Sequence, residues 1–145
     1  MIKRYNNDAY REIFEDKSKF AEVFQEYFGR EWISLKELNY DKFLEFIKDK
    51  EMFIYKPINS AQGQGIKKIE TKQFQSSRNL YDYIKDTYKE NGIIEDWITQ
   101  HQEVSNLYSK SVNPVRIVSV NKNGRFNIVA AGLTIGNGRD IQMFV

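Results

Sequence analysis

The first part of the chain carries apolar side chains at helical spacing. Between residues 8 and 28, aromatic and aliphatic positions recur three or four residues apart, which predicts one amphipathic helix. Gly29 follows where helices commonly end in a left-handed glycine. After a short strand over 31–35, Asn39 is expected to cap a second helix that runs to about Lys50. The buried side of that helix is expected to carry Phe43, Leu44, Phe46 and Ile47.

Alternation typical of strands dominates the rest of the chain. Strands are predicted over 52–58 and 66–69, on either side of a loop of small residues. Ser76 or Ser77 is expected to begin a third helix that ends near Glu90, and 93–97 reads as a short apolar strand. Residues 98–112 show no clear period.

Two hairpins are expected near the end of the chain. Strands over 114–120, 126–135 and 141–145 are separated by the turn pairs Asn123-Gly124 and Asn137-Gly138. Helices therefore come first and antiparallel strands later. This order predicts an α+β fold and argues against a doubly wound parallel sheet.

Composition narrows the class of protein. The 145 residues fit one domain, and 22 Lys and Arg against 20 Asp and Glu leave a net charge of +2. That balance argues against a nucleic-acid binder driven by excess charge. The chain has no cysteine and one histidine, which excludes disulfide frameworks and thiolate or histidine-cluster zinc sites. A metal, if used, would be a hard cation held by oxygens.

The same features predict a cytoplasmic protein. The absence of cysteine is consistent with a reducing compartment, and the first residues lack the apolar segment of a signal peptide. The longest apolar stretch, 128–135, is far shorter than the ~20 residues of a membrane span.

The segment from Phe53 to Gly65 is the most informative for chemistry. Lys56 lies inside an apolar strand, and a lysine there needs an anionic partner. The loop Ser60–Gly65 offers two glycines, whose backbone can turn N–H groups toward phosphate oxygens. A phosphate grip and a flexible hairpin whose lysine reaches solvent are both consistent with this segment. It is neither a Walker A loop nor a dinucleotide fingerprint, because a strand follows rather than a helix.

Two further segments favour nucleotide binding. Glu95 and Asp96 directly follow a buried strand, where backbone groups can bind an adenine edge and a carboxylate can accept ribose hydroxyls. Arg116 lies in the strand Val115–Val120, on the face of Val118 and opposite Ile117, and a guanidinium there suits polyphosphate or carboxylate. Taken singly, Glu95 and Asp96 are better explained as solvated acids at a strand end, and a surface-strand arginine is the alternative for Arg116.

The ordered set of motifs resembles the ATP-grasp superfamily, and most closely the sugar-transfer-associated ATP-grasp family of polysaccharide-biosynthesis loci. The resemblance runs from the first helix to the last strand. Its five motifs are Glu15-Asp16-Lys17, Phe28-Gly29-Arg30-Glu31-Trp32, Tyr55-Lys56-Pro57 with its glycine loop, Ile94–His101, and Ser111–Val118.

This resemblance implies an ATP site between two α+β lobes and assigns a role to each motif. It implies that Lys17 and Lys56 bind phosphate, that the glycine loop covers the phosphates, and that Arg116 is catalytic, near the reacting phosphate or acyl group. The residues implied to bind ATP are Lys17, Lys56, Ser60, Gln62, Gly63, Gly65, Glu95, Asp96, Trp97 and Ile98. Such enzymes activate a carboxylate as an acylphosphate, which an amine or thiol attacks, with Mg²⁺ neutralising the phosphates. The acceptor would be a small molecule that the sequence does not identify.

The chain departs from the family pattern in its metal ligands. Only Asp140 aligns with the late acidic ligands for Mg²⁺, and the Glu-x-Asn that usually follows is absent. We therefore expect a truncated, partial ATP-grasp-like domain over 1–145, with a helical and glycine-hairpin lobe over about 1–92 and an adenine hinge with antiparallel strands over about 93–145. A second copy of the chain is expected to cover its open sheet edge.

Two alternatives remain open at this point. The same fold could serve as a non-catalytic nucleotide-binding or interaction module that has lost its metal site. A small RNA-binding protein is a weaker alternative, based on slight basicity and the aromatic residues of the first helix. His101, the single histidine, is expected to be structural rather than a general base.

Overall fold

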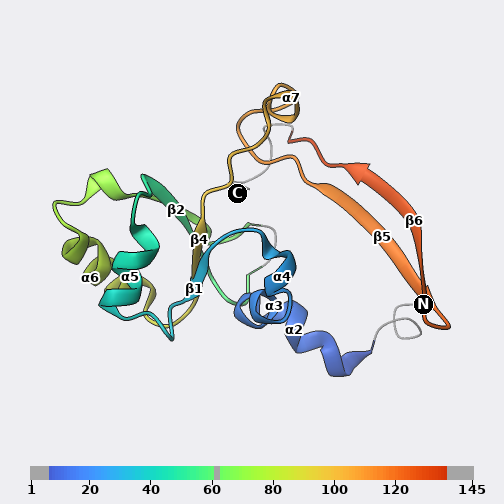
Figure 1. Ribbon diagram of the computed structural model, residues 1–145, viewed down its shortest axis with the longest axis horizontal. Helices are drawn as coiled ribbons and strands as arrows, with labels where there is room; N and C mark the ends of the chain where they lie inside the picture. Colours follow the sequence, from blue (N-terminus) through green and yellow to red (C-terminus); the bar gives the residue numbers. More distant parts are fainter. Residues whose placement is uncertain (1–6, 61–62, 137–145) are drawn as a thin grey trace. The chain divides into compact units, whose positions relative to one another are not determined.

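The computed structural model describes residues 7–60 and 63–136 (Figure 1). Contacts divide the chain into two compact units, of which one is Ala9–Trp97 and the other contains Ile98 and the residues after it. Helices and antiparallel strands both occur, so the α+β prediction is confirmed. No helix within the described ranges is long and apolar enough to cross a membrane.

A four-stranded antiparallel sheet organises the first unit. Its strands are β1 (Trp32–Ser34), β2 (Met52–Lys56), β3 (Lys67–Glu70) and β4 (Ile93–Asp96), in the order β1-β4-β2-β3. The register pairs Ile54 of β2 with Glu95 of β4, and Trp32 of β1 with the same Glu95. Side chains alternate across a strand, so these three residues share one face of the sheet.

The opposite face of the sheet carries the main hydrophobic core. Helices α5 (Tyr40–Ile47) and α6 (Ser77–Tyr88) cover it (Figure 1). Asn39 and Ser76 accept hydrogen bonds from the first-turn N–H groups of Lys42 and Asn79, and so cap these helices as predicted. The core consists mainly of Leu35, Leu38, Phe43, Phe46, Phe53, Tyr55, Ile69, Leu80, Ile84 and Ile94. Leu44, expected on the buried side of α5, is 39% exposed, because that helix turns only Phe43 and Phe46 fully inward.

The predicted single helix over 8–28 is wrong in detail. The segment is divided into a 3-10 turn, η1 (Asp8–Tyr10), and three short helices, α2 (Arg11–Glu15), α3 (Lys17–Val23) and α4 (Gln25–Phe28). The chain is extended at Asp16, whose carboxylate accepts the N–H groups at the start of α3. A capping residue placed within an apolar period therefore ends one helix and begins another.

The second unit contains a short helix and a long hairpin. Helix α7 (Gln102–Ser105) falls in the segment without a clear period, and β5 (Val115–Lys122) pairs with β6 (Arg125–Leu133). The register shifts between Val118 and Ser119, and Asn123 and Gly124 form the turn with positive φ angles, as predicted. The strand expected over 141–145 and the turn at Asn137-Gly138 lie outside the described residues.

The hairpin has one apolar face and one basic face. Cross-strand pairing places all its exposed cations, Arg116, Lys122 and Arg125, on one side. The other side has no charge and presents large exposed side chains, of which Phe126 is 76% exposed. These side chains are Val115, Ile117, Phe126, Ile128 and Leu133.

Candidate functional site

Glu95 is the centre of a cluster of charged residues on the face of the sheet opposite the main core. Its side chain is 1% exposed, although it is a carboxylate on a strand only four residues long. Oε1 forms an ion pair with the ammonium of Lys56, and Oε2 lies 3.3 Å from Nη2 of Arg30. Each oxygen therefore has its own cationic partner, which is what a buried carboxylate requires.

Arg30 reaches Glu95 from the segment between α4 and β1. Gly29 ends α4 in the left-handed conformation, at φ 65°, and turns the chain toward the sheet. The guanidinium lies over the ring of Phe28, with 4.1 Å between its central carbon and the ring centroid. Its Nε is buried and has no hydrogen-bond partner among the described residues.

Lys17 is the third cation of the cluster, at the first residue of α3. Its ammonium donates to the carbonyl oxygens of Ile58 (3.1 Å) and Ser60 (2.6 Å) and to the Ser60 hydroxyl (3.1 Å). Burial and the nearby charge of Lys56 lower the pKa of Lys17, while Asp16 and Glu95 act in the opposite direction. The helix start is thus attached to the chain that leaves β2, at the predicted phosphate loop.

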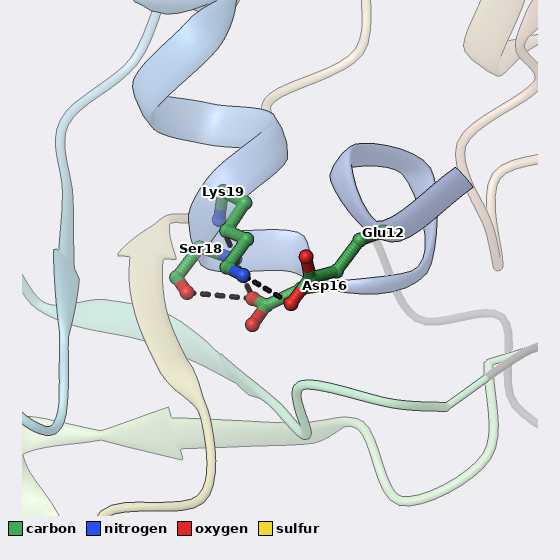
Figure 2. A network of polar contacts seen from close by, with 4 residues as sticks. All are labelled: Glu12, Asp16, Ser18 and Lys19. Atoms are coloured by element: carbon green, nitrogen blue, oxygen red, sulfur yellow. Dashed lines mark hydrogen bonds and ion pairs between the residues drawn. The ribbon is translucent and has the colours of Figure 1, made fainter. Parts of the chain in front are cut away.

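A capping network fixes the start of α3 and therefore the position of Lys17. Asp16 Oδ1 accepts the backbone N–H of Ser18 at 2.8 Å and its hydroxyl at 2.6 Å, and Lys19 pairs with Glu12 (Figure 2). Burial alone would raise the pKa of Asp16, but the hydrogen bonds from Ser18 and Lys19 lower it below its usual value. The ionised carboxylate is the form that stabilises this helix start.

Asp96 points to the other face of the sheet and takes part in a different contact. Its Oδ2 accepts the N–H of Glu31 at 2.8 Å, and its Oδ1 lies 3.3 Å from the Lys50 ammonium. Lys50 also pairs with Glu31 at 2.6 Å and lies over the ring of Phe46. Burial would lower the pKa of Lys50, but these two carboxylates raise it. In this arrangement Asp96 joins β4 to the residue before β1 and to the segment between α5 and β2.

The glycine loop is described at Ser60 and from Gly63 onward. Gly63 and Gly65 have φ angles of 75° and 74°, a conformation that favours glycine. A Cβ on Gly65 would come within 2.8 Å of the Pro57 ring. The loop thus returns closely past the end of β2, beside Lys56. Gln62, which the resemblance assigns to this loop, lies outside the described residues.

The remaining predicted residues are divided between the two units. Trp97 follows Glu95 on the same face, and the Lys68 ammonium lies 5.1 Å from its ring. Ile98 and Arg116 belong to the second unit, where Arg116 is exposed on the basic face of the β5–β6 hairpin. His101 Nδ1 accepts the N–H of Glu103 at 3.4 Å at the start of α7, which gives this histidine a structural contact. Asp140 lies outside the described residues.

Sequence reasoning missed the roles of Arg30 and Lys50. Both approach strand β4 from segments far away in the sequence, by 65 residues in the case of Arg30 and Glu95. A single arginine after a helix-ending glycine carries no pattern that predicts a contact of this range. The alternation of Glu95 and Asp96 along a strand was the available signal, since two adjacent acids on a buried strand need cations on both faces.

No group of three acidic or histidine side chains that could hold a metal occurs in the described parts of the chain. Mg²⁺ therefore stays an expectation of the sequence resemblance.

Comparison with known protein families gives a match: the family model described as sugar-transfer associated ATP-grasp matches residues 1–142. No curated protein and no solved structure matches the chain.

Proposed function

Since the chain belongs to the sugar-transfer associated ATP-grasp family, we propose that the cluster around Glu95 binds the polyphosphate of ATP. The observation that carries the proposal is the pairing of Arg30 and Lys56 with one buried carboxylate, with the ammonium of Lys17 within electrostatic range of Lys56. Counting Asp16 beside Lys17, three cations meet two anions, so the cluster keeps an excess of positive charge in a partly buried setting. Such a site attracts a multiply charged anion.

Each part of the cluster has a function in this proposal. Lys17 and Lys56 bind phosphate oxygens, and the backbone N–H groups around Gly63 and Gly65 supply further donors, as in other phosphate-binding loops. The adenine lies toward the end of β4, near Glu95 and Trp97. Lys17 would exchange the carbonyl oxygens of Ile58 and Ser60, which are neutral acceptors, for charged ones.

We further propose that the bound ATP activates a carboxylate. A carboxylate oxygen of the substrate attacks the γ-phosphorus, ADP leaves, and an amine or thiol then displaces phosphate from the acylphosphate. Positioning and charge neutralisation supply most of the rate in such transfers. Arg116 is proposed to stabilise the charge on the reacting group. The reaction fits ligases of surface-polysaccharide assembly, with a small-molecule acceptor still to be identified.

The direct test of nucleotide binding is thermal unfolding with and without ATP. A ligand at 100 times its Kd stabilises the folded state by about 2.7 kcal/mol, so the unfolding temperature should rise with ATP concentration. Adenosine should give a much smaller rise, because it lacks the phosphates that the three cations attract. Calorimetric titration with ATP then supplies the Kd.

A matched variant separates site binding from non-specific attraction. Lys17→Met should reduce the ATP-dependent rise, whereas Lys36→Met, an exposed lysine between β1 and α5, should leave it unchanged. Equal rises with ATP for both variants, or no binding at millimolar ATP, would refute the assignment of the phosphate site.

A further inference from the structure

Lys56 meets two requirements that conflict. Its side chain is 13% exposed and forms an ion pair with Glu95, which is itself 1% exposed. To bind a phosphate, the ammonium must turn away from this carboxylate at least in part. A buried carboxylate that loses its only cation is strongly destabilised, so a two-membered pair would hold Lys56 in place.

Arg30 removes this conflict because it contacts the other oxygen of the same carboxylate. The Arg30–Glu95 contact uses Oε2, so it persists when Lys56 leaves Oε1. The guanidinium lies over Phe28 and is 25% exposed, which restricts its own movement. An arginine also stays charged at any physiological pH, so it supplies a permanent counter-charge.

Lys17 makes departure of Lys56 from Glu95 easier when an anion is present. The two lysine charges are close enough that Lys56 lowers the pKa of Lys17. A polyphosphate placed near both ammonium groups would replace their repulsion by two attractions. Glu95 would stay behind, paired with Arg30.

We propose that Arg30 is a positioning residue that keeps Glu95 compensated, so that Lys56 can exchange this carboxylate for a phosphate. The inference rests on the proposed ATP site and adds a residue to which no nucleotide contact is assigned. Arg30 acts through Glu95 and Lys56, and not on the phosphate itself. Without it, Lys56 would remain bound to Glu95 as the only counter-ion of that carboxylate.

A double-mutant cycle tests this coupling. ATP, adenosine and tripolyphosphate binding are measured by calorimetry for the wild type, Arg30→Met, Glu95→Gln and the double variant. Arg78→Met is the matched control, because Arg78 is an exposed arginine of α6 paired with Asp82. Thermal unfolding of each variant checks that the chain is folded.

Arg30→Met should weaken ATP and tripolyphosphate about tenfold to hundredfold, the worth of one charge-assisted hydrogen bond, and leave adenosine unchanged. In the Glu95→Gln background the same substitution should change ATP affinity less than about threefold, because Lys56 no longer has a carboxylate to compensate. Arg30→Lys, which keeps the charge, should stay close to the wild type. An undiminished effect of Arg30→Met in that background would overturn the inference, as would no effect in the wild type.

A measurement on the wild-type side chains keeps the inference testable if Arg30→Met fails to fold. With ¹³C-methylated lysines, the Lys56 signal, assigned by Lys56→Arg, should shift on saturation with tripolyphosphate. The Glu95 carboxyl ¹³C signal should retain an ionised shift. A Lys56 signal that does not move while ATP binds would overturn the exchange and leave the ATP site intact. A wild type that binds no ATP would overturn both.

Discussion

Two adjacent acidic residues of strand β4 make different contacts on opposite faces of the sheet. Glu95 faces Lys56 and Arg30, whereas its neighbour Asp96 faces Lys50 and the N–H of Glu31. Strand alternation alone sends adjacent side chains to opposite faces. A substitution of one of these residues removes one charge from a contact whose partners are known. The direction of its effect on stability and on ATP affinity can therefore be predicted.

Lys56→Met should lower both stability and ATP affinity. Glu95 would keep only Arg30, so we expect a loss of about 1–3 kcal/mol, less than for a buried pair left wholly without a partner. ATP binding should weaken much more than adenosine binding. Chemical unfolding and calorimetry measure the two effects, with Lys67→Met, at an exposed position of β3, as the control. Adding Glu95→Gln should recover most of the stability. A Lys56→Met protein as stable as the wild type would contradict this pairing.

Asp16→Ala should destabilise the start of α3 in a pH-dependent way. Loss of a helix cap costs about 1 kcal/mol at neutral pH. The folded state lowers the pKa of Asp16, so its contribution is complete above the unfolded pKa of about 3.9 and disappears as the pH falls through the lower folded value. Urea unfolding at pH 7 and at pH 2.5 should show the difference shrinking in acid. Glu22→Ala, on the same helix, should show no such cap-like loss at pH 7.

The sequence predicted several of these residues but not their contacts. A lysine inside an apolar strand indicated a buried anionic partner, and Lys56 has one in Glu95. Which anion it would be could not be derived, because pairing of β2 with β4 brings together residues 39 positions apart in the numbering. The phosphate role of Lys17 and Lys56 stays a prediction.

At the scale of elements, caps were easier to predict than helix length. Asn39, Ser76 and Gly29 act as expected, because each works through neighbouring backbone groups. The apolar period of 8–28 predicted one helix and missed its breaks. Asp16 accepts two N–H groups in an extended conformation, and this local competition outweighs the continuity of the apolar face.

The segment before β5 is organised by one buried amide. Asn113 is 4% exposed, and its Nδ2 donates to the carbonyl oxygens of Val104 and Tyr108, each at 2.9 Å. Its Oδ1 accepts the N–H of Gly136 at 3.2 Å. These bonds attach α7 and the chain after β6 to the start of the strand that carries Arg116.

Asn113→Ala should loosen this segment without affecting the first unit. Leaving buried carbonyls unpaired costs about 1–3 kcal/mol. Amide hydrogen exchange should therefore accelerate near Val104 and at the start of β5, while β2 and β4 keep their protection. Asn127→Ala, on exposed β6, is the control and should change little. Unchanged exchange near Val104 would show that the amide is dispensable.

At the scale of the whole molecule, the described residues show two units with unequal cores. The first has a sheet with buried side chains on both faces, whereas β5 and β6 have no buried side chain. An isolated two-stranded hairpin is marginally stable in water. Alternation along 114–135 predicted the two strands, but nothing in a sequence pattern specifies what covers an apolar face.

Hydrogen exchange on the whole chain should reveal this inequality. Amides of β5 and β6 should exchange faster than those of β2 and β4, since fewer buried contacts oppose local opening. The comparison should be repeated over a range of protein concentrations. Protection of β5 and β6 that rises with concentration would show that a second copy covers the hairpin, at its apolar face or at its open edge. Equal, concentration-independent protection would contradict the expected weakness of the hairpin.

The adjacent acids of β4 also protect the sheet against misalignment. If β4 slipped by one residue toward its carboxyl end, Ile94 would take the place of Glu95, and Lys56 and Arg30 would face a hydrocarbon. A slip in the other direction would put Asp96, with its shorter side chain, in the place of Glu95. Lys50 would then lie opposite Trp97. In each misaligned state, at least one buried lysine or arginine would lack an anionic partner. The charges that we assign to ligand binding thus also select one pairing of the strands during folding.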